Sequence, residues 1–138
     1  MDAARLRRYK EKLDLIGLRL REFEEWSGVM LTSEKDKLAS YKCFQEVSEA
    51  VNDIIAMMLR DEKLLPAEDY PNIEKAINHH LIPPSLKVPL REMTGLRNRL
   101  VHHYNGIDDR VARDSARTLL TVIRAFVAHV RQWLREKK

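Results

Sequence analysis

Apolar residues recur every three or four positions along most of the chain, and this spacing predicts helices. Within residues 2–26 the apolar positions are Leu6, Tyr9, Leu13, Ile16, Leu20 and Phe23. Charged residues fill most of the positions between them, which is typical of an amphipathic helix with one buried face. Gly28 is expected to end this first helix, since glycine is common just beyond a helix C-terminus.

A second amphipathic pattern begins after Thr32 and Ser33. Either residue can cap a helix, because its side-chain oxygen can accept a hydrogen bond from a free backbone N–H of the first turn. The buried face predicted for this helix is Leu38, Tyr41, Phe44, Val47, Val51, Ile54, Ile55 and Met58. Pro66 and the acidic residues that follow it predict a loop that reaches Asp69.

Two shorter helices are predicted next. Pro71 suits the first turn of a helix that runs to about His79. Residues 81–84 are expected to form an extended link, because a residue before proline avoids helical angles. Ser85 is then expected to cap a helix that reaches about Val101 or His103.

The last helix follows a break at Asn105-Gly106 and is expected to be capped by Asp108 or Asp109. Its inward face is predicted to be Leu119, Val122, Ile123, Phe126, Val127, Val130, Trp133 and Leu134. No segment sustains the alternation of apolar and polar residues that a β-strand shows. The pattern therefore predicts an all-α, up-and-down bundle of four or five helices, formed as a single domain over residues 1–138.

Composition narrows the class of protein further. The chain has 138 residues, of which 44% are apolar and 33% charged, and this excludes collagen-like, low-complexity and disordered classes. Cys43 is the single cysteine, so a disulfide framework within the chain is excluded, and its apolar neighbours predict a core position. No apolar run approaches the roughly 18 residues that cross a bilayer, so we expect a cytoplasmic protein that does not enter the membrane.

Positive charge is concentrated in the C-terminal third. The formal net charge is +4, and residues 91–138 contain 11 Lys and Arg against 5 Asp and Glu. Such an excess attracts partners that bear phosphate groups. A solvated helix face rich in arginine also accounts for it, so charge alone leaves both interpretations open.

One stretch breaks the pattern of apolar and polar positions: Gly95, Leu96, Arg97, Asn98, Arg99, Leu100, Val101, His102, His103 and Tyr104. Polar side chains at a helix end suit a site, because groups from the helix and from the next loop can converge there. Arg97 and His102 are five residues apart, about 140° around an ideal helix. They converge only if the helix loosens after Val101 or if a second subunit completes the site.

The string RNRLVHHY at 97–104, followed by Asn-Gly-Ile-Asp-Asp, resembles the R-x4-H-x-Y motif of HEPN-fold proteins. It is most similar to the motif of HepT-type toxins, which are paired with minimal nucleotidyltransferase antitoxins of the MntA type. The helix order, the proline-containing link and the capped last helix extend the resemblance over nearly the whole chain. The resemblance implies a HEPN-like homodimer whose two motif helices line one basic cleft, and a metal-independent endoribonuclease.

The resemblance also implies roles for single residues. Arg97 and His102 match the catalytic pair, and Asn98 matches the polar residue that commonly follows the arginine. Tyr104 matches the tyrosine that the nucleotidyltransferase modifies with AMP to silence the toxin. In the second helix, Glu49 and Asp53 fall where the family often has acidic residues that face the motif.

These roles agree with the chemistry of RNA cleavage. RNA carries its own nucleophile, the 2′-hydroxyl, beside each phosphodiester. A histidine can take that proton near neutral pH, and an arginine can stabilise charge on the phosphoryl oxygens. His102 is therefore expected to be the general acid–base and Arg97 the phosphate clamp, with no metal ion or other cofactor.

Alternatives stay open for several of these residues. His103 can be the active histidine, and Tyr104 can be an ordinary packing residue. Glu49 and Asp53 can orient Arg97, or they can form a polar helix face or a structural salt link. The competing function is a non-catalytic helical module that binds a nucleotide or the nucleotidyltransferase, with the motif serving recognition only.

Overall fold

The structure is a computed structural model that describes residues 1–102 and 106–137, and within these residues every regular element is a helix. The elements are α1 (Ala3–Ser27), α2 (Glu34–Asp61), α3 (Asp69–Asn78), the short 3₁₀ helix η1 (Pro84–Leu86), α4 (Lys87–His102) and α5 (Asp109–Glu136). The predicted all-α bundle is therefore confirmed, with five α-helices in the described parts of the chain.

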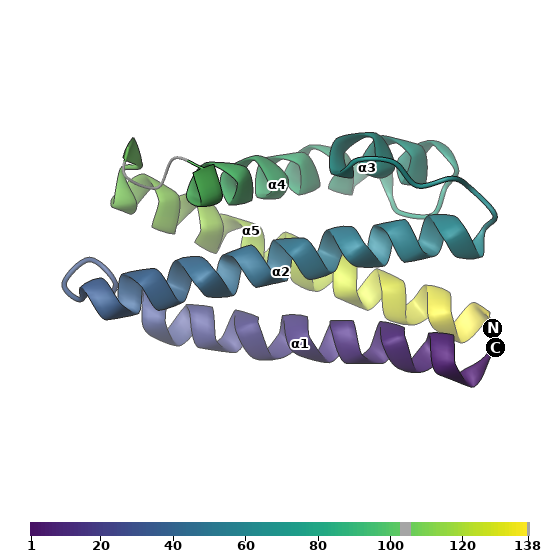
Figure 1. Ribbon diagram of the computed structural model, residues 1–138, viewed down its shortest axis with the longest axis horizontal. Coiled ribbons are helices and arrows are strands. Elements are labelled where there is room, and N and C mark those ends of the chain that lie inside the picture. Colours follow the sequence, from purple (N-terminus) through teal and green to yellow (C-terminus); the bar gives the residue numbers. More distant parts are fainter. Residues whose placement is uncertain (103–105, 138) are drawn as a thin grey trace.

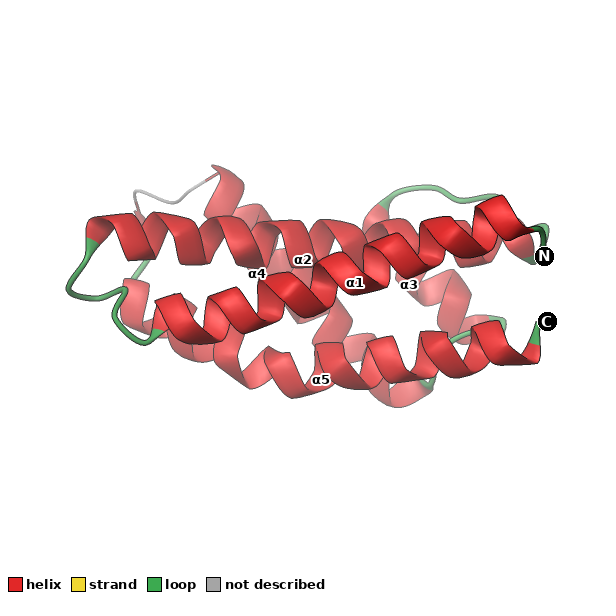
Figure 2. Ribbon diagram, turned by 90° about the horizontal axis from the view of Figure 1, so that it is seen from below, coloured by secondary structure: helices red, strands yellow, loops and turns green. Residues whose placement is uncertain are grey.

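Three long helices, α1, α2 and α5, span the bundle, and the shorter α3 and α4 lie along one side of it (Figure 1). α2 runs antiparallel to both α1 and α4, which lie on either side of it. The view from below shows that α5 crosses α1 at an angle and that both termini lie at the same end of the molecule (Figure 2). This arrangement places the C-terminal half of α4 beside the middle of α2.

The buried faces of the helices meet in one apolar core. All six apolar positions predicted for α1 pack in this core, although Leu6 is only partly buried. In α5, Val122 and Val127 are likewise partly buried and pack against the core. The side chains buried most completely include Tyr9, Leu13, Ile16, Phe23, Phe44, Ile54, Ile55, Met58 and Phe126. Burying one such side chain contributes roughly 1.5–3 kcal/mol relative to leaving it exposed.

Cys43 lies in this core, as its apolar neighbours predict. Burial raises the pKa of its thiol to about 11. At neutral pH the side chain is therefore an apolar thiol and not a reactive thiolate.

Two predictions about α2 and α4 are wrong. Leu38 is 49% exposed, because it lies about 120° around α2 from Phe44, outside the buried stripe. Ser85 does not cap α4, because Pro84 starts a 3₁₀ turn that already contains Ser85 and leads directly into Lys87.

The other predicted caps are confirmed. The Ser33 side chain accepts a hydrogen bond from the backbone N–H of Asp36, and Asp108 accepts from the N–H groups of Arg110 and Val111. Gly28 follows α1 directly. Across residues 1–102 and 106–137, no helix is both long and apolar enough to cross a membrane.

Candidate active site

Arg97 lies on the side of α4 that faces the core. At 100° per residue it falls in the same stripe as Leu90, Met93 and Leu100, which are all buried. An arginine in such a stripe has to extend its charge to the edge of the helix, because an unpaired buried charge is unfavourable. The Arg97 side chain is 25% exposed, so the guanidinium reaches the surface.

Two side chains hold the guanidinium of Arg97. Nη2 donates a hydrogen bond to Oε1 of Glu49 on α2 at 3.1 Å, and Nη1 donates to Oδ1 of Asn98 at 3.0 Å. Gln45, one turn earlier on α2, donates to the same Glu49 oxygen at 3.2 Å. Nε of Arg97 is buried, and no described residue accepts a hydrogen bond from it. The fold thus brings together three residues that the sequence singles out, Arg97, Asn98 and Glu49.

Asp53 makes a different contact. Its Oδ2 accepts a hydrogen bond from Nζ of Lys12 on α1 at 3.2 Å, and its side chain is 60% exposed. Of the two acidic residues expected near the motif, Glu49 is therefore the one that contacts Arg97, and Asp53 forms a surface salt link between α1 and α2.

A buried hydrogen bond one turn from Arg97 fixes α2 against α4. Nδ2 of Asn52 donates to Oγ1 of Thr94 at 3.1 Å, and the Thr94 hydroxyl donates to the carbonyl of Leu90 at 3.0 Å. Both polar side chains are buried. This pair was not predicted from the sequence. A polar residue at a core position of each helix was the signal that could have revealed it.

Asp69, the first residue of α3, is a second residue that sequence reasoning missed. Burial raises the pKa of its carboxyl, the positive charge of Arg97 lowers it, and the negative charges of Asp53 and Glu49 add to the rise. The carboxyl therefore shares one electrostatic environment with Arg97. Chain spacing does not reveal this proximity, because Asp69 belongs to another helix.

His102 is the last residue of α4 and is exposed. Because α4 stays helical through His102, the helix itself does not loosen to bring this side chain back to Arg97, and the two leave α4 in directions about 140° apart. His103 and Tyr104 lie outside the described residues. Among the described residues, no three His, Cys, Asp or Glu side chains gather where they could hold a metal ion.

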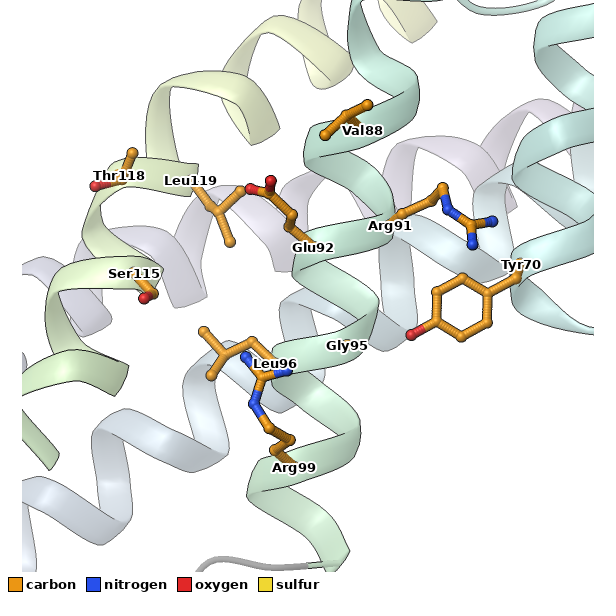
Figure 3. Close-up of a pocket in the computed structure, with 10 residues that line it drawn as sticks. All are labelled: Tyr70, Val88, Arg91, Glu92, Gly95, Leu96, Arg99, Ser115, Thr118 and Leu119. Carbon is orange, nitrogen blue, oxygen red and sulfur yellow. The ribbon is translucent and has the colours of Figure 1, made fainter. Parts of the chain in front are cut away.

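A cavity of about 620 Å³ opens on the outer face of α4, between α5 and the start of α3 (Figure 3). Its lining includes Arg91 and Arg99 of α4, and the guanidinium of Arg91 lies 4.8 Å from the centre of the Tyr70 ring. A smaller cavity of about 230 Å³ shares Arg99 with it and continues along α5 to Val111. Glu92 lines the larger cavity, and His102 follows Arg99 by one turn, so the basic side chains of this outer face are concentrated toward the C-terminal end of α4.

Comparison with known proteins gives a consistent picture. The sequence matches the family model described as Ribonuclease HepT-like over residues 7–130. A protein of Archaeoglobus fulgidus that is provisionally named an RNase is 36% identical over 104 residues, 75% of this chain and 76% of that protein. A protein of Aphanizomenon flos-aquae named tRNA nuclease HepT is 31% identical over 104 residues, 70% of this chain and 69% of that protein.

A solved structure shares the fold. The tri-AMPylated HEPN toxin of Shewanella oneidensis, solved in complex with its MNT antitoxin, aligns with a TM-score of 0.85 over 96% of this chain and 99% of that chain. The two sequences are 18% identical, so this likeness establishes the HEPN-like bundle and nothing finer.

Proposed function

The chain belongs to the HepT-like ribonuclease family, and on that premise we propose that it is the endoribonuclease toxin of a toxin–antitoxin pair. Arg97 and His102 are its catalytic residues, and cleavage needs no metal ion. The observation that supports this most is Arg97 itself, which occupies a core-facing position of α4 with its guanidinium held by Glu49 and Asn98. A helix bundle that only needs to fold gains little from a charge in that position.

The reaction is a transesterification within the RNA. The 2′-oxygen attacks the adjacent phosphorus, the bond from phosphorus to the 5′-oxygen breaks, and the products end in a 2′,3′-cyclic phosphate and a 5′-hydroxyl. The imidazole of His102 takes the proton from the 2′-hydroxyl. A second histidine, in its imidazolium form, returns a proton to the departing 5′-oxygen. The guanidinium of Arg97 stabilises the charge that develops on the phosphoryl oxygens.

A homodimer completes this site. Because His102 lies about 60° around α4 from Arg99, it is close to the outer face of that helix, and a second copy against this face brings its own motif helix and a second histidine for the second proton transfer. The adjoining cavities on that face are bordered by Val88 and Val111, each 61% exposed. Covering these two valines with a second copy removes their apolar surface from water, which favours association.

The proposed partner is a cognate minimal nucleotidyltransferase that silences the toxin by attaching AMP to Tyr104. The Shewanella oneidensis toxin with the same fold is AMPylated and bound to such an antitoxin. A nucleotide two residues beyond His102 blocks the cleft by its bulk and repels RNA by its negative charge. Transfer RNA is the first substrate to assay, since one relative is named a tRNA nuclease.

Cleavage of RNA in EDTA by purified, unmodified protein tests the proposal. The wild type is expected to release fragments that end in 2′,3′-cyclic phosphate. Arg97→Ala and His102→Ala are each expected to lower the rate by roughly 10²–10⁴-fold without changing the circular dichroism spectrum. Matched controls are Arg60→Ala and His79→Ala, which remove an exposed arginine and an exposed histidine elsewhere.

Other outcomes reassign the function. Cleavage that survives His102→Ala but not His103→Ala moves the acid–base role by one residue. No cleavage by wild-type protein, with an intact mass that shows no AMP, supports the non-catalytic module.

Incubation with the nucleotidyltransferase and ATP tests the proposed modification of Tyr104. Tyr104→Phe is expected to abolish the increase in protein mass, and the control Tyr70→Phe is expected to keep it.

A further inference from the structure

One surface that the proposed site does not use includes a stripe of α5 whose charged residues are all arginines. Between residues 115 and 135, α5 contains no Asp or Glu but has four arginines, Arg117, Arg124, Arg131 and Arg135. At 100° and 1.5 Å per residue these four lie within about 40° of one another and span roughly 27 Å along the helix. A solvated helix usually interleaves both signs of charge, so this stripe is an unusual surface.

The stripe borders a groove between α5 and α1, the α1/α5 groove. The two helices cross at an angle (Figures 1 and 2), and two cavities open between their side chains. One cavity, of about 170 Å³, is lined in part by Arg21 and Arg124. The other, of about 240 Å³, is lined in part by Lys10, Arg131 and Arg135. Both helices therefore contribute cations to the same groove.

Acidic residues only partly neutralise this groove. Asp14 faces Arg131 with an oxygen–nitrogen distance of 3.6 Å, and Glu24 pairs with Arg124. The side chains of these pairs are 43–76% exposed, and ion pairs of such exposure contribute little to stability. A ligand with several phosphates can therefore displace them, and five cations against two carboxylates leave a positive excess.

The groove and the proposed catalytic face lie on different sides of α5. Ser115 and Thr118 line the cavity beside α4 (Figure 3). They lie about 160° and 100° around α5 from Arg117, the first residue of the arginine stripe. A second copy that covers the outer face of α4 therefore leaves the α1/α5 groove open.

We propose that the α1/α5 groove, defined by Lys10, Arg21, Arg124, Arg131 and Arg135, binds the phosphate backbone of RNA outside the cleavage site. This inference rests on the proposed ribonuclease function and adds a second RNA contact to it. Arginine suits the role, because its planar guanidinium donates two parallel hydrogen bonds to one phosphate. Binding of this kind is independent of base sequence and favours RNA long enough to reach both sites.

The exposed side of α5 also leaves room for a nucleic-acid backbone. The residues between the arginines on that side are Thr121, Ala125 and Ala128, and all three are exposed. Their side chains are small and uncharged, so a phosphate chain can approach α5 closely without meeting a bulky or acidic group. Acidic proteins offer fewer and more widely spaced charges than RNA, which carries one on every nucleotide.

Binding of transfer RNA at several salt concentrations tests the groove directly. The parent is His102→Ala, which prevents cleavage, and the groove variant adds Arg124→Gln, Arg131→Gln and Arg135→Gln. Loss of three phosphate contacts is expected to reduce the slope of log K against log salt by about 2 and to weaken binding at least about tenfold at low salt. The matched control adds Arg60→Gln, Lys63→Gln and Lys87→Gln, which remove the same charge elsewhere, and is expected to keep the parent slope.

Cleavage kinetics separate this inference from the proposed function. With His102 intact, the groove substitutions are expected to lower the ratio of kcat/KM for transfer RNA to kcat/KM for a tetranucleotide about tenfold. If the wild type cleaves RNA but the groove and control variants give the same slope and ratio, the groove proposal is wrong and the ribonuclease proposal stands. If the wild type neither binds nor cleaves RNA, both proposals are wrong. If the groove variant binds RNA like the control variant but no longer binds the nucleotidyltransferase, the groove proposal is wrong and the groove binds a protein.

Discussion

At the scale of a single residue, Arg97 is constrained by where α4 places it. A guanidinium on a core-facing stripe needs a carboxylate within reach, and Glu49 provides one from α2 at 3.1 Å. Asn98 accepts a second hydrogen bond and Gln45 steadies the carboxylate. The side chain is thereby held in one orientation before any substrate arrives, which is what a charged group needs to stabilise a transition state.

Glu49→Gln tests whether this orientation matters for the proposed reaction. Without the carboxylate the guanidinium is free to move, and a displacement of about 1 Å can lower kcat by up to about a hundredfold while KM changes less. Steady-state cleavage kinetics measure both constants. Glu46→Gln is the matched control, because Glu46 lies one turn from Glu49 on α2 and pairs with Arg19 of α1 instead. Equal kcat for Glu49→Gln and wild type would give Glu49 a purely structural role.

At the scale of the helices, local sequence signals predict most of the helix boundaries. They predict the buried faces less completely. A cap involves side chains and N–H groups within three residues, so Ser33 and Asp108 are readable from the sequence. Ser85 fails as a cap because Pro84 begins a helical turn one residue earlier. Leu38 fails as a core residue because it lies about 120° around α2 from Phe44, so an apolar side chain within the repeating pattern still falls outside the buried stripe.

Asp108→Ala is expected to destabilise the protein by about 1 kcal/mol, because two N–H groups at the start of α5 lose their acceptor. Chemical denaturation at a fixed protein concentration measures the change in the free energy of unfolding. Ser85→Ala is the matched comparison and is expected to change that free energy by less than about 0.5 kcal/mol. A loss from Ser85→Ala as large as that from Asp108→Ala would show that Ser85 has a capping role after all.

At the scale of the whole molecule, α5 separates two surfaces. The outer face of α4, with Val88 and Val111 at its borders, is the proposed dimer surface, and the α1/α5 groove is the proposed RNA surface. One helix serves both because its two exposed sides face different neighbours. The basic C-terminal third of the sequence thereby contributes to both surfaces.

Val88→Asp combined with Val111→Asp is expected to weaken the proposed dimer at least about tenfold, because two charges replace apolar side chains at the contact. Sedimentation equilibrium measures the dissociation constant, and cleavage is expected to fall with the dimer fraction. Leu65→Asp is the control, because Leu65 is 81% exposed and lies in the loop between α2 and α3. A double variant that remains as dimeric as the control would place the dimer surface elsewhere.

The helices, most of their buried faces and the motif residues can be predicted from the sequence, because each depends on spacing within one helix or on a short string. Three features emerge only from the packed bundle: Glu49 and not Asp53 holds Arg97, Asp69 shares the electrostatic environment of Arg97, and the arginines of α5 meet cations of α1. They are absent from the sequence pattern because contacts between helices depend on the register and crossing angle of those helices. These follow from packing and from buried bonds such as the one from Asn52 to Thr94.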